Sequence, residues 1–234
     1  LARPENRASV TRGLEALSQD RHTPGRAALL DVAGAQPGEI DSQVIGFRIG
    51  PRINAAGRLD DAQFILRMLQ CRDVNQAQTM AQELDNLNRR RQTIQRQVEQ
   101  AALKMVPESP PAFVVVAGKE EDGWHRGVVG IVASRLKDQL NRPCAVVSIQ
   151  GDRAVGSVRS VKEVHAVRAL ESASDLLEKF GGHPAAAGFT VPTEQLEELS
   201  NRLNHAARAQ LTGDDWVQER QADITTPASA IDMA

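Results

Sequence analysis

Residues 73–106 contain neither glycine nor proline. Apolar side chains recur through them at spacings of three and four, which predicts one continuous helix about 50 Å long. The predicted seam carries positions 77, 80, 84, 87, 91, 94, 98, 101 and 105, interrupted only by the basic Arg91. Such a helix could form a homodimeric coiled coil or join two domains, with its seam packed on them. We favour the connector.

Three shorter helices are predicted before it, at residues 4–17, 24–33 and 41–49. Gly50-Pro51 is expected to close the third, because proline lacks an amide hydrogen and clashes with the preceding turn. Residues 54–57 are predicted to form a loop or a helix entry. Asp60 and Asp61 are expected to cap one more short helix.

Strands and helices are mixed after the long helix, which predicts an α/β layer structure. Strands are predicted at residues 112–117, 144–149 and 153–158, and another ends at Thr190 and Val191. Helices are predicted at residues 127–140, 165–173 and 194–210, the last of them capped by Thr193. Residues 216–224 look like one strand of a further domain.

Composition and charge narrow the class of protein. Aromatic residues make up 3% of the chain and tyrosine is absent, so side chains that stack on bases must be few. The two cysteines have no metal-ligand spacing, which favours reduced thiols in a cytoplasmic protein. No apolar run is long enough to span a membrane, and no signal peptide is visible. Because the chain begins at Leu1, we expect it to be cut from a longer protein.

The net charge of −2 is unevenly distributed. Residues 124–168 hold eight basic and three acidic side chains, giving +5, and the remainder of the chain is −7. A basic segment within an acidic chain suits local capture of phosphate. A solvated surface without a ligand is the alternative.

Residues 180–189, Phe-Gly-Gly-His-Pro-Ala-Ala-Ala-Gly-Phe, are the densest motif. Gly181 and Gly182 allow a close approach of the backbone to a ligand or a turn with positive φ. His183 can donate, accept or carry charge near neutral pH. The small residues that follow it cannot form an ordinary core face. The motif indicates a site that faces phosphate, or else a tight turn with an incidental histidine.

Two further motifs carry polar side chains suited to anions. His125 and Arg126 precede an expected helix start, where backbone N–H groups favour negative charge. Ser157 and Arg159 alternate on one strand, so they point to the same side and could clamp a phosphate. An exposed loop tip and a solvent-facing strand are the alternatives.

Arginines also gather on either side of the start of the long helix. Arg52, Asn54 and Arg58 form a polar group in the glycine-flanked segment 50–59, suited to substrate binding or to capping and salt bridging. Arg89, Arg90 and Arg91 point about 100° apart on the long helix and cannot form one stripe. They make a solvated face or touch a nucleic-acid backbone.

Four motifs together resemble one protein family. They are residues 50–59 (Gly-Pro-Arg-Ile-Asn-Ala-Ala-Gly-Arg-Leu), 124–136 (starting Trp-His-Arg-Gly), 156–160 (Gly-Ser-Val-Arg-Ser) and the Gly-Gly-His motif. In this order they resemble the DHHA1 domain of the DHH phosphoesterase superfamily and, within it, the bacterial single-strand DNA-specific 5′-to-3′ exonucleases.

The resemblance implies a domain plan. Residues 1–72 would be the helical C-terminal part of a DHH catalytic domain, and 73–106 the connector helix. Residues 107–212 would be a mixed-sheet α/β DHHA1 domain that binds substrate. Residues 213–234 would begin an OB-like domain.

The resemblance also implies a chemistry. Exonucleases of this superfamily hydrolyse phosphodiester bonds in DNA repair and recombination with two divalent metals, Mn²⁺ or Mg²⁺. No Asp-His-His run is visible in the chain, so the metal ligands are expected outside it, and the chain alone is expected to be inactive. His183 would then touch the scissile phosphate, or hold a group that touches it, without being a metal ligand.

The expected partners are single-stranded DNA, a single-strand binding protein and a helicase, with no membrane and a monomeric state. One alternative is an oligoribonuclease or cyclic-dinucleotide phosphodiesterase of the same superfamily. A non-catalytic binding module, such as the related part of alanyl-tRNA synthetases, is another.

Overall fold

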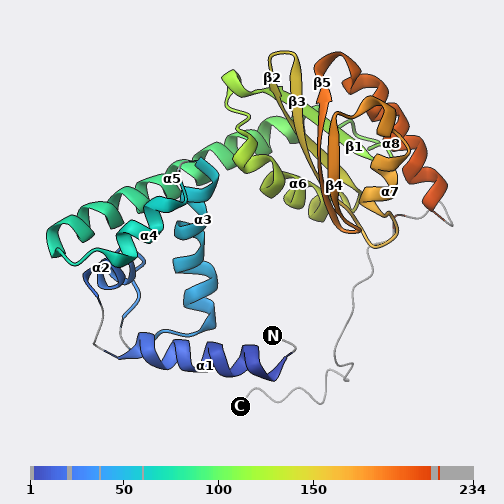
Figure 1. Ribbon diagram of the computed structural model, residues 1–234. Coiled ribbons are helices and arrows are strands. Elements are labelled where there is room, and N and C mark those ends of the chain that lie inside the picture. Colours follow the sequence, from blue (N-terminus) through green and yellow to red (C-terminus); the bar gives the residue numbers. More distant parts are fainter. Residues whose placement is uncertain (1–2, 20–22, 37, 60, 212–215, 217–234) are drawn as a thin grey trace, which may run out of the picture. The chain divides into compact units, whose positions relative to one another are not determined.

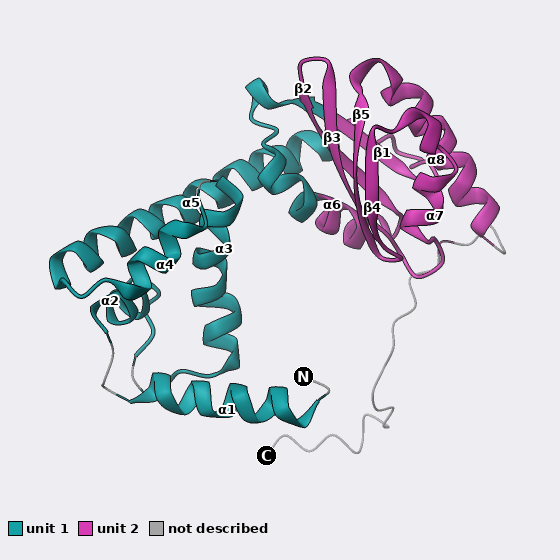
Figure 2. Cartoon of the chain, in the orientation of Figure 1, with its two compact units in different colours: residues 1–104, 118–132 teal, residues 105–117, 133–234 magenta. Residues whose placement is uncertain are grey.

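The computed structural model describes residues 3–19, 23–36, 38–59, 61–211 and 216 (Figure 1). They form two compact units, one of residues 1–104 with 118–132, the other of residues 105–117 with 133–234 (Figure 2). The domain boundaries predicted from the sequence stay predictions. The OB-like domain expected from residue 213 lies outside the described residues, apart from Trp216.

The first unit consists mainly of helices. They are α1 (Pro4–Ser18), α2 (Pro24–Val32), the π-helix η1 (Val44–Ile49), α3 (Gly50–Leu59), α4 (Gln63–Gln70) and α5 (Val74–Met105), with the short η2 (Glu120–Asp122) and the first turns of α6. The core joins apolar side chains of α2, α4 and α5, among them Leu29, Met68 and Leu84. The helices predicted at 4–17, 24–33 and 73–106 are confirmed.

The predicted stop at Gly50-Pro51 is wrong. Helix η1 continues directly into α3, and the Gly50 N–H donates to the Ile45 carbonyl, five residues back. Pro51 has no N–H to donate and its ring crowds the carbonyl four residues earlier. A π-type turn just before the proline widens the helix and accommodates the ring.

Residues 54–57, predicted to form a loop or a helix entry, lie inside α3, so the loop alternative is wrong. Ala55 and Ala56 are fully buried, so packing holds this glycine-flanked stretch in a helix. Of the two predicted caps, Asp60 lies outside the described residues. The Asp61 carboxylate accepts a hydrogen bond from the Gln63 N–H at 2.9 Å, at the start of α4.

The buried side of α5 changes character along its length. Its first half contributes Ala77, Ala81 and Leu84 to the core of the first unit. Polar side chains are buried next, and Arg91 donates to the side chains of Asn88 and Gln95 at 2.8 and 2.9 Å. The basic interruption predicted in the seam is therefore matched by neutral acceptors one turn away.

The second unit is built on a five-stranded mixed sheet. Its strands are β1 (Val114–Lys119), β2 (Cys144–Gln150), β3 (Arg153–Arg159), β4 (Lys179–His183) and β5 (Ala186–Pro192), in the order β1-β2-β3-β5-β4. The β2–β3, β3–β5 and β4–β5 pairs are antiparallel. Helix α6 (Arg126–Leu140) lies between β1 and β2 in sequence, as a crossover between parallel neighbours requires.

Helices α7 (Ala166–Glu171) and α8 (Leu196–Gln210) pack on one face of this sheet (Figure 1). The core between the sheet and these helices contains Ala154 and Val158 of β3 and Phe189 and Val191 of β5. Gly156 lies in the same row, where a Cβ would come within 2.1 Å of the Phe189 ring. The alternation places the other side chains of these strands on the opposite face.

Strand β4 was not predicted. Gly181, Gly182 and His183 end an exposed edge strand, whereas the sequence left a phosphate-facing site and a tight turn open as alternatives. Glycine is a poor strand former by itself, and pairing with β5 holds this segment extended. Thr193 does not cap α8, because its hydroxyl donates to the Gly151 carbonyl at 3.0 Å, and a short 3₁₀ turn precedes the helix.

No helix in the described part of the chain combines the length and the apolar character needed to cross a bilayer.

The two cysteines should differ in reactivity. Cys144 is fully buried on β2, and burial raises the pKa of its thiol to about 12, against the smaller opposing effect of Lys137 and Arg142. Cys71 is half-buried. Because the thiolate is the reactive form, a thiol reagent at pH 8 should modify Cys71 in the folded protein and Cys144 only after unfolding. Mass spectrometry of the labelled peptides would show this, with Cys71→Ser as the control. Equal labelling rates in the folded chain would contradict it.

Candidate functional site

The predicted polar residues of β3 and β4 lie on one face of the sheet. We call the open face the side of β3, β5 and β4 that faces away from α7 and α8. Its side chains, by strand register, are those of Arg153, Val155, Ser157, Arg159, Lys179, Gly181, His183, Ala186, Gly188, Thr190 and Pro192. Four predicted site residues, Ser157, Arg159, Gly181 and His183, are thus brought together.

The register arranges these side chains in rows across the three strands. Arg159 pairs with Ala186, which pairs with His183. Neighbouring strands lie about 4.8 Å apart, so Arg159 and His183 are about 10 Å apart across the small Ala186. The Arg159 Nη1 donates to the Ser157 hydroxyl at 3.3 Å and to the Val158 carbonyl at 2.8 Å. A cation is therefore held on the same side of the sheet as an exposed histidine.

Gly182 is required by the β4–β5 pairing. Its φ is +149°, and a Cβ there would lie 2.4 Å from the Ala186 carbonyl oxygen. Gly181 differs, because a Cβ there would meet no atom within 4 Å. One glycine of the motif thus allows two strands to come close, and the other leaves open space on the open face.

The turn that follows His183 is held by hydrogen bonds to the carbonyl oxygens of Pro184 and Ala185. The Pro184 oxygen accepts from the Ala166 N–H at 2.8 Å, and the Ala185 oxygen accepts from the Ser160 N–H at 2.9 Å. The Ser160 hydroxyl, itself buried, donates to the Val164 carbonyl. These bonds tie the tip that carries His183 to the segment between β3 and α7.

His125 and Arg126 lie at the start of α6, as predicted, in the first unit. The His125 Nδ1 accepts a hydrogen bond from the Gly127 N–H at 3.0 Å, so His125 satisfies one amide that an anion would otherwise use. Arg126 is exposed in the first turn of the helix. Arg126 therefore remains accessible to an anion, and His125 orders the helix start.

Arg58 is connected to this helix start. Its Nη1 donates to the Gly127 carbonyl at 3.0 Å, and a Cβ on Gly127 would lie 2.1 Å from the Arg58 carbonyl oxygen. This role of Gly127 was not predicted from the sequence. Only glycine fits so close a contact, because any other residue would place a Cβ there. Three predicted residues, Arg58, His125 and Arg126, are therefore neighbours through Gly127.

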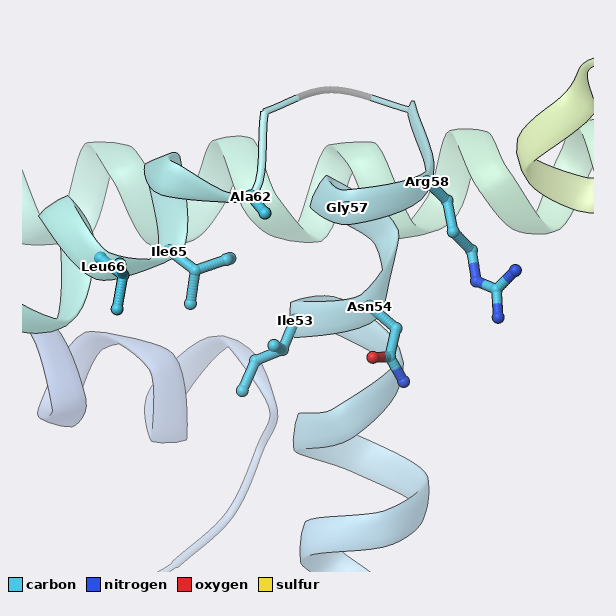
Figure 3. A pocket seen from close by; sticks show the side chains of 7 residues that line it. All are labelled: Ile53, Asn54, Gly57, Arg58, Ala62, Ile65 and Leu66. Atoms are coloured by element: carbon cyan, nitrogen blue, oxygen red, sulfur yellow. The ribbon is translucent and has the colours of Figure 1, made fainter.

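Asn54 and Arg58 also line a pocket of about 530 Å³ between α3 and α4, completed by Ile53, Gly57, Ala62, Ile65 and Leu66. Figure 3 shows the two polar side chains at one end of it and the branched aliphatic side chains at the other. The apolar majority of the lining makes this a hydrophobic hollow with a polar end.

Arg52 is held by a buried carboxylate. Its Nε and Nη2 lie 2.9 and 2.8 Å from one oxygen of Asp85, and the other oxygen accepts from the Arg89 Nε at 2.7 Å. The Asp85 side chain is 5% exposed and that of Arg89 is 75% exposed. This contact ties α3 to α5 and matches the salt-bridge alternative for Arg52. In the sequence, Asp85 looks like an ordinary polar helix position, so its role as a buried counter-ion was not predicted.

Residues 110–209 match the DHHA1 domain family. Over 94% of its length the chain is 36% identical to the single-stranded-DNA-specific exonuclease RecJ of Bacillus subtilis, and over 87% it is 40% identical to RecJ of Thermus thermophilus. It covers 28% and 29% of those proteins. The chain thus spans less than a third of the length of these two relatives.

Solved structures of RecJ are also similar to this chain. The crystal structure of Thermus thermophilus RecJ with Mg²⁺ matches with a TM-score of 0.76 and 38% identity, over 87% of this chain and 31% of that one. A structure of exonuclease RecJ bound to manganese matches with a TM-score of 0.74 and 37% identity, over 87% of this chain and 50% of that one. The residues that match the DHHA1 domain family carry the whole open face.

Asp85→Ala should destabilise the chain strongly. The substitution leaves the guanidinium of Arg52 inside the helical unit without its counter-ion, which typically costs about 3 kcal/mol. Urea unfolding followed by circular dichroism would measure the loss. Glu83→Ala, two residues away on the exposed side of α5, serves as the control and should change the free energy of unfolding by less than about 0.5 kcal/mol. Similar free energies of unfolding for the two variants would contradict the structural role of Asp85.

Proposed function

We propose that this chain is the strand- and phosphate-binding part of a single-strand-specific DNA exonuclease. The whole enzyme would hydrolyse phosphodiester bonds from the 5′ end in DNA repair and recombination. One observation carries the proposal: Ser157, Arg159 and His183 share the open face of a DHHA1 domain, in a chain similar to RecJ over nearly all its length.

The open face can hold a phosphate by simple electrostatics. Arg159 presents a guanidinium steadied by the Ser157 hydroxyl, and such a planar fork binds phosphate oxygens in pairs. His183, exposed in the same row, can donate to a phosphodiester oxygen. We assign Arg159 and Ser157 to the phosphate at the 5′ end and His183 to the scissile phosphate. Gly181 and Gly182 let the strand approach the sheet.

The group around α6 is a second contact region in the proposal. Arg126 and Asn54 are exposed, and Arg58 lies at the start of α6 through its bond to Gly127. We assign these residues to the sugar-phosphate backbone of the bound strand, with His125 and Arg52 holding them in place.

The described residues do not fit the two-metal centre that such an exonuclease needs. No three histidine, cysteine, aspartate or glutamate side chains come together anywhere in that part of the chain. The solved RecJ structures contain Mg²⁺ or Mn²⁺. We therefore infer that the ligands of Mn²⁺ or Mg²⁺ belong to the rest of the enzyme.

The likeness to RecJ supports the remaining assignments. The partner is single-stranded DNA, and we expect a single-strand binding protein and a helicase to act with the enzyme. We further expect a monomer in the cytoplasm.

Arg159→Ala should weaken binding of 5′-phosphorylated single strands more than binding of 5′-hydroxyl strands. A terminal phosphate carries more charge than a backbone diester, and losing a charged hydrogen bond of this kind costs about 1.5–3 kcal/mol, about tenfold or more in affinity. Ser157→Ala should act in the same direction with a smaller effect. Fluorescence anisotropy with labelled oligonucleotides would measure both.

Arg153→Ala is the matched control, because it removes the same charge from the other end of β3, where Arg153 pairs with Glu178 at 3.1 Å. It should leave the preference for a 5′ phosphate unchanged. Equal losses for both kinds of strand on Arg159→Ala would refute an end-binding role for β3.

The chain by itself should not cleave single-stranded DNA, even with Mn²⁺ added. The carboxylate and histidine cluster that would activate water is missing from the described residues. Gel analysis of a 5′-labelled oligonucleotide incubated with purified chain would test this. Cleavage that disappears with His183→Ala would show that a complete active site lies within the chain.

A further inference from the structure

A hollow of about 430 Å³ lies on the open face beside the row of Arg159 and His183. On this face it is lined by Val155, Lys179, Gly181, Gly188 and Thr190, with Gly156, Phe180 and Phe189 at its base. None of the motifs described above accounts for Val155, Lys179 or Thr190. The hollow is therefore a candidate for a second binding site on the same sheet.

The strand register gives the hollow its form. Gly188 pairs with both Ser157 and Gly181, so the floor between these residues carries no large side chain. Val155, Thr190 and Lys179 form the next row and make one wall. The row of Arg159, Ala186 and His183 lies on the other side of the floor. The result is a trough with exposed peptide groups at its base.

The fold explains two of the four glycines here and leaves the other two unexplained. Gly156 and Gly182 are required, because a Cβ would meet the Phe189 ring at 2.1 Å or the Ala186 carbonyl at 2.4 Å. A Cβ at Gly181 would meet nothing within 4 Å, and one at Gly188 only the Gly156 carbonyl at an ordinary 3.7 Å. Alanine would fit at both positions, yet glycine leaves the trough open.

The charges on this face suit a nucleic acid. The three rows contain Arg159, Lys179 and His183 and no carboxylate. The nearest described acid along the chain is Glu178, which is bound to Arg153 at the far end of β3. The face therefore attracts a polyanion along the direction of the trough.

We propose that the trough receives the base of a nucleotide next to the phosphate bound by Arg159, lying flat on the peptide groups of Gly181 and Gly188. This rests on the proposed function. Val155 supplies an apolar edge for the ring. The Thr190 hydroxyl and the Lys179 ammonium group reach acceptors that every base carries, so the site tolerates any sequence.

The trough also explains how strandedness is selected. The rows that form the trough carry no phenylalanine, tryptophan or tyrosine side chain on the open face, so the flat surface beneath a base in the trough has to come from peptide groups. A base can lie on that surface only when it is unpaired and unstacked. Bases held in a duplex cannot reach a trough whose floor is the sheet itself, and the site therefore favours single strands over duplexes.

Abasic scanning tests the proposal on the chain itself. The probes are 5′-phosphorylated oligothymidylates with one abasic position at each of the first four nucleotides. Wild-type chain should lose about tenfold in affinity at one position and little at the other three. Gly181→Ala and Gly188→Ala should bind the intact probe about as weakly as wild type binds that abasic probe. Both variants should bind the intact probe and that abasic probe with the same affinity.

Gly13→Ala is the matched control, because a Cβ at Gly13 in α1 also meets nothing within 4 Å. It should bind all probes as wild type does. Unchanged thermal unfolding of Gly181→Ala and Gly188→Ala would show that the sheet is intact. If either unfolds, Thr190→Val is the second test and should reduce the loss at the same abasic position.

Two results would overturn the trough. One is wild-type binding that is indifferent to all four abasic positions, and the other is a Gly181→Ala chain that still shows the full abasic loss. The Arg159→Ala measurement separates these from a failure of the proposed function. If Arg159→Ala weakens binding of 5′-phosphorylated strands more than binding of 5′-hydroxyl strands, the proposed function stands and only the trough is rejected. Equal losses for the two kinds of strand would reject both.

Discussion

The pairing of β5 with β3 and β4 is the constraint on which the candidate site depends. Side chains alternate along a strand, so a slip of one residue would move Ser157, Arg159 and His183 into the core and Phe189 into solvent. Burial of Phe189 and Val191 against α7 and α8 prevents that slip. The close approach at Gly182 adds a second restraint, because only glycine lets β4 and β5 come together there. Core packing on one face thus sets the chemistry of the other.

The helical unit relies on a different kind of interaction. Asp85 is buried on α5 and is neutralised by Arg52 from α3 and by Arg89 from its own helix. A buried carboxylate is tolerated only with such partners. The contact holds α3 in register with α5, and α3 in turn presents Asn54 and Arg58. At its other end, α3 meets the start of α6 through Gly127, so local packing positions a second polar group.

Much of this could be predicted from the sequence. The long helix, the alternating strand β3 and the shared side of Ser157 and Arg159 follow from periodicity, which reports local geometry directly. The apolar run of β2 indicates a buried strand. The helix predicted at residues 41–49 was not expected to continue past Gly50-Pro51, because a π-type turn lets the chain pass a proline that normally ends a helix. Strand β4 was missed for a similar reason: Gly181 and Gly182 have no strand preference, and their extended form comes from pairing with β5.

The sequence by itself determined the types of residue available: a guanidinium and a hydroxyl two residues apart, a histidine after two glycines, and a helix with no break. These are local properties of the chain. Only the tertiary structure decided that Arg159 and His183 share a row, that Gly188 faces both Ser157 and Gly181, and that Arg52 is held by Asp85. The physical reason is that strand order, register and ion pairing join residues distant in the chain, and burial of the core selects among the pairings that local preference leaves open.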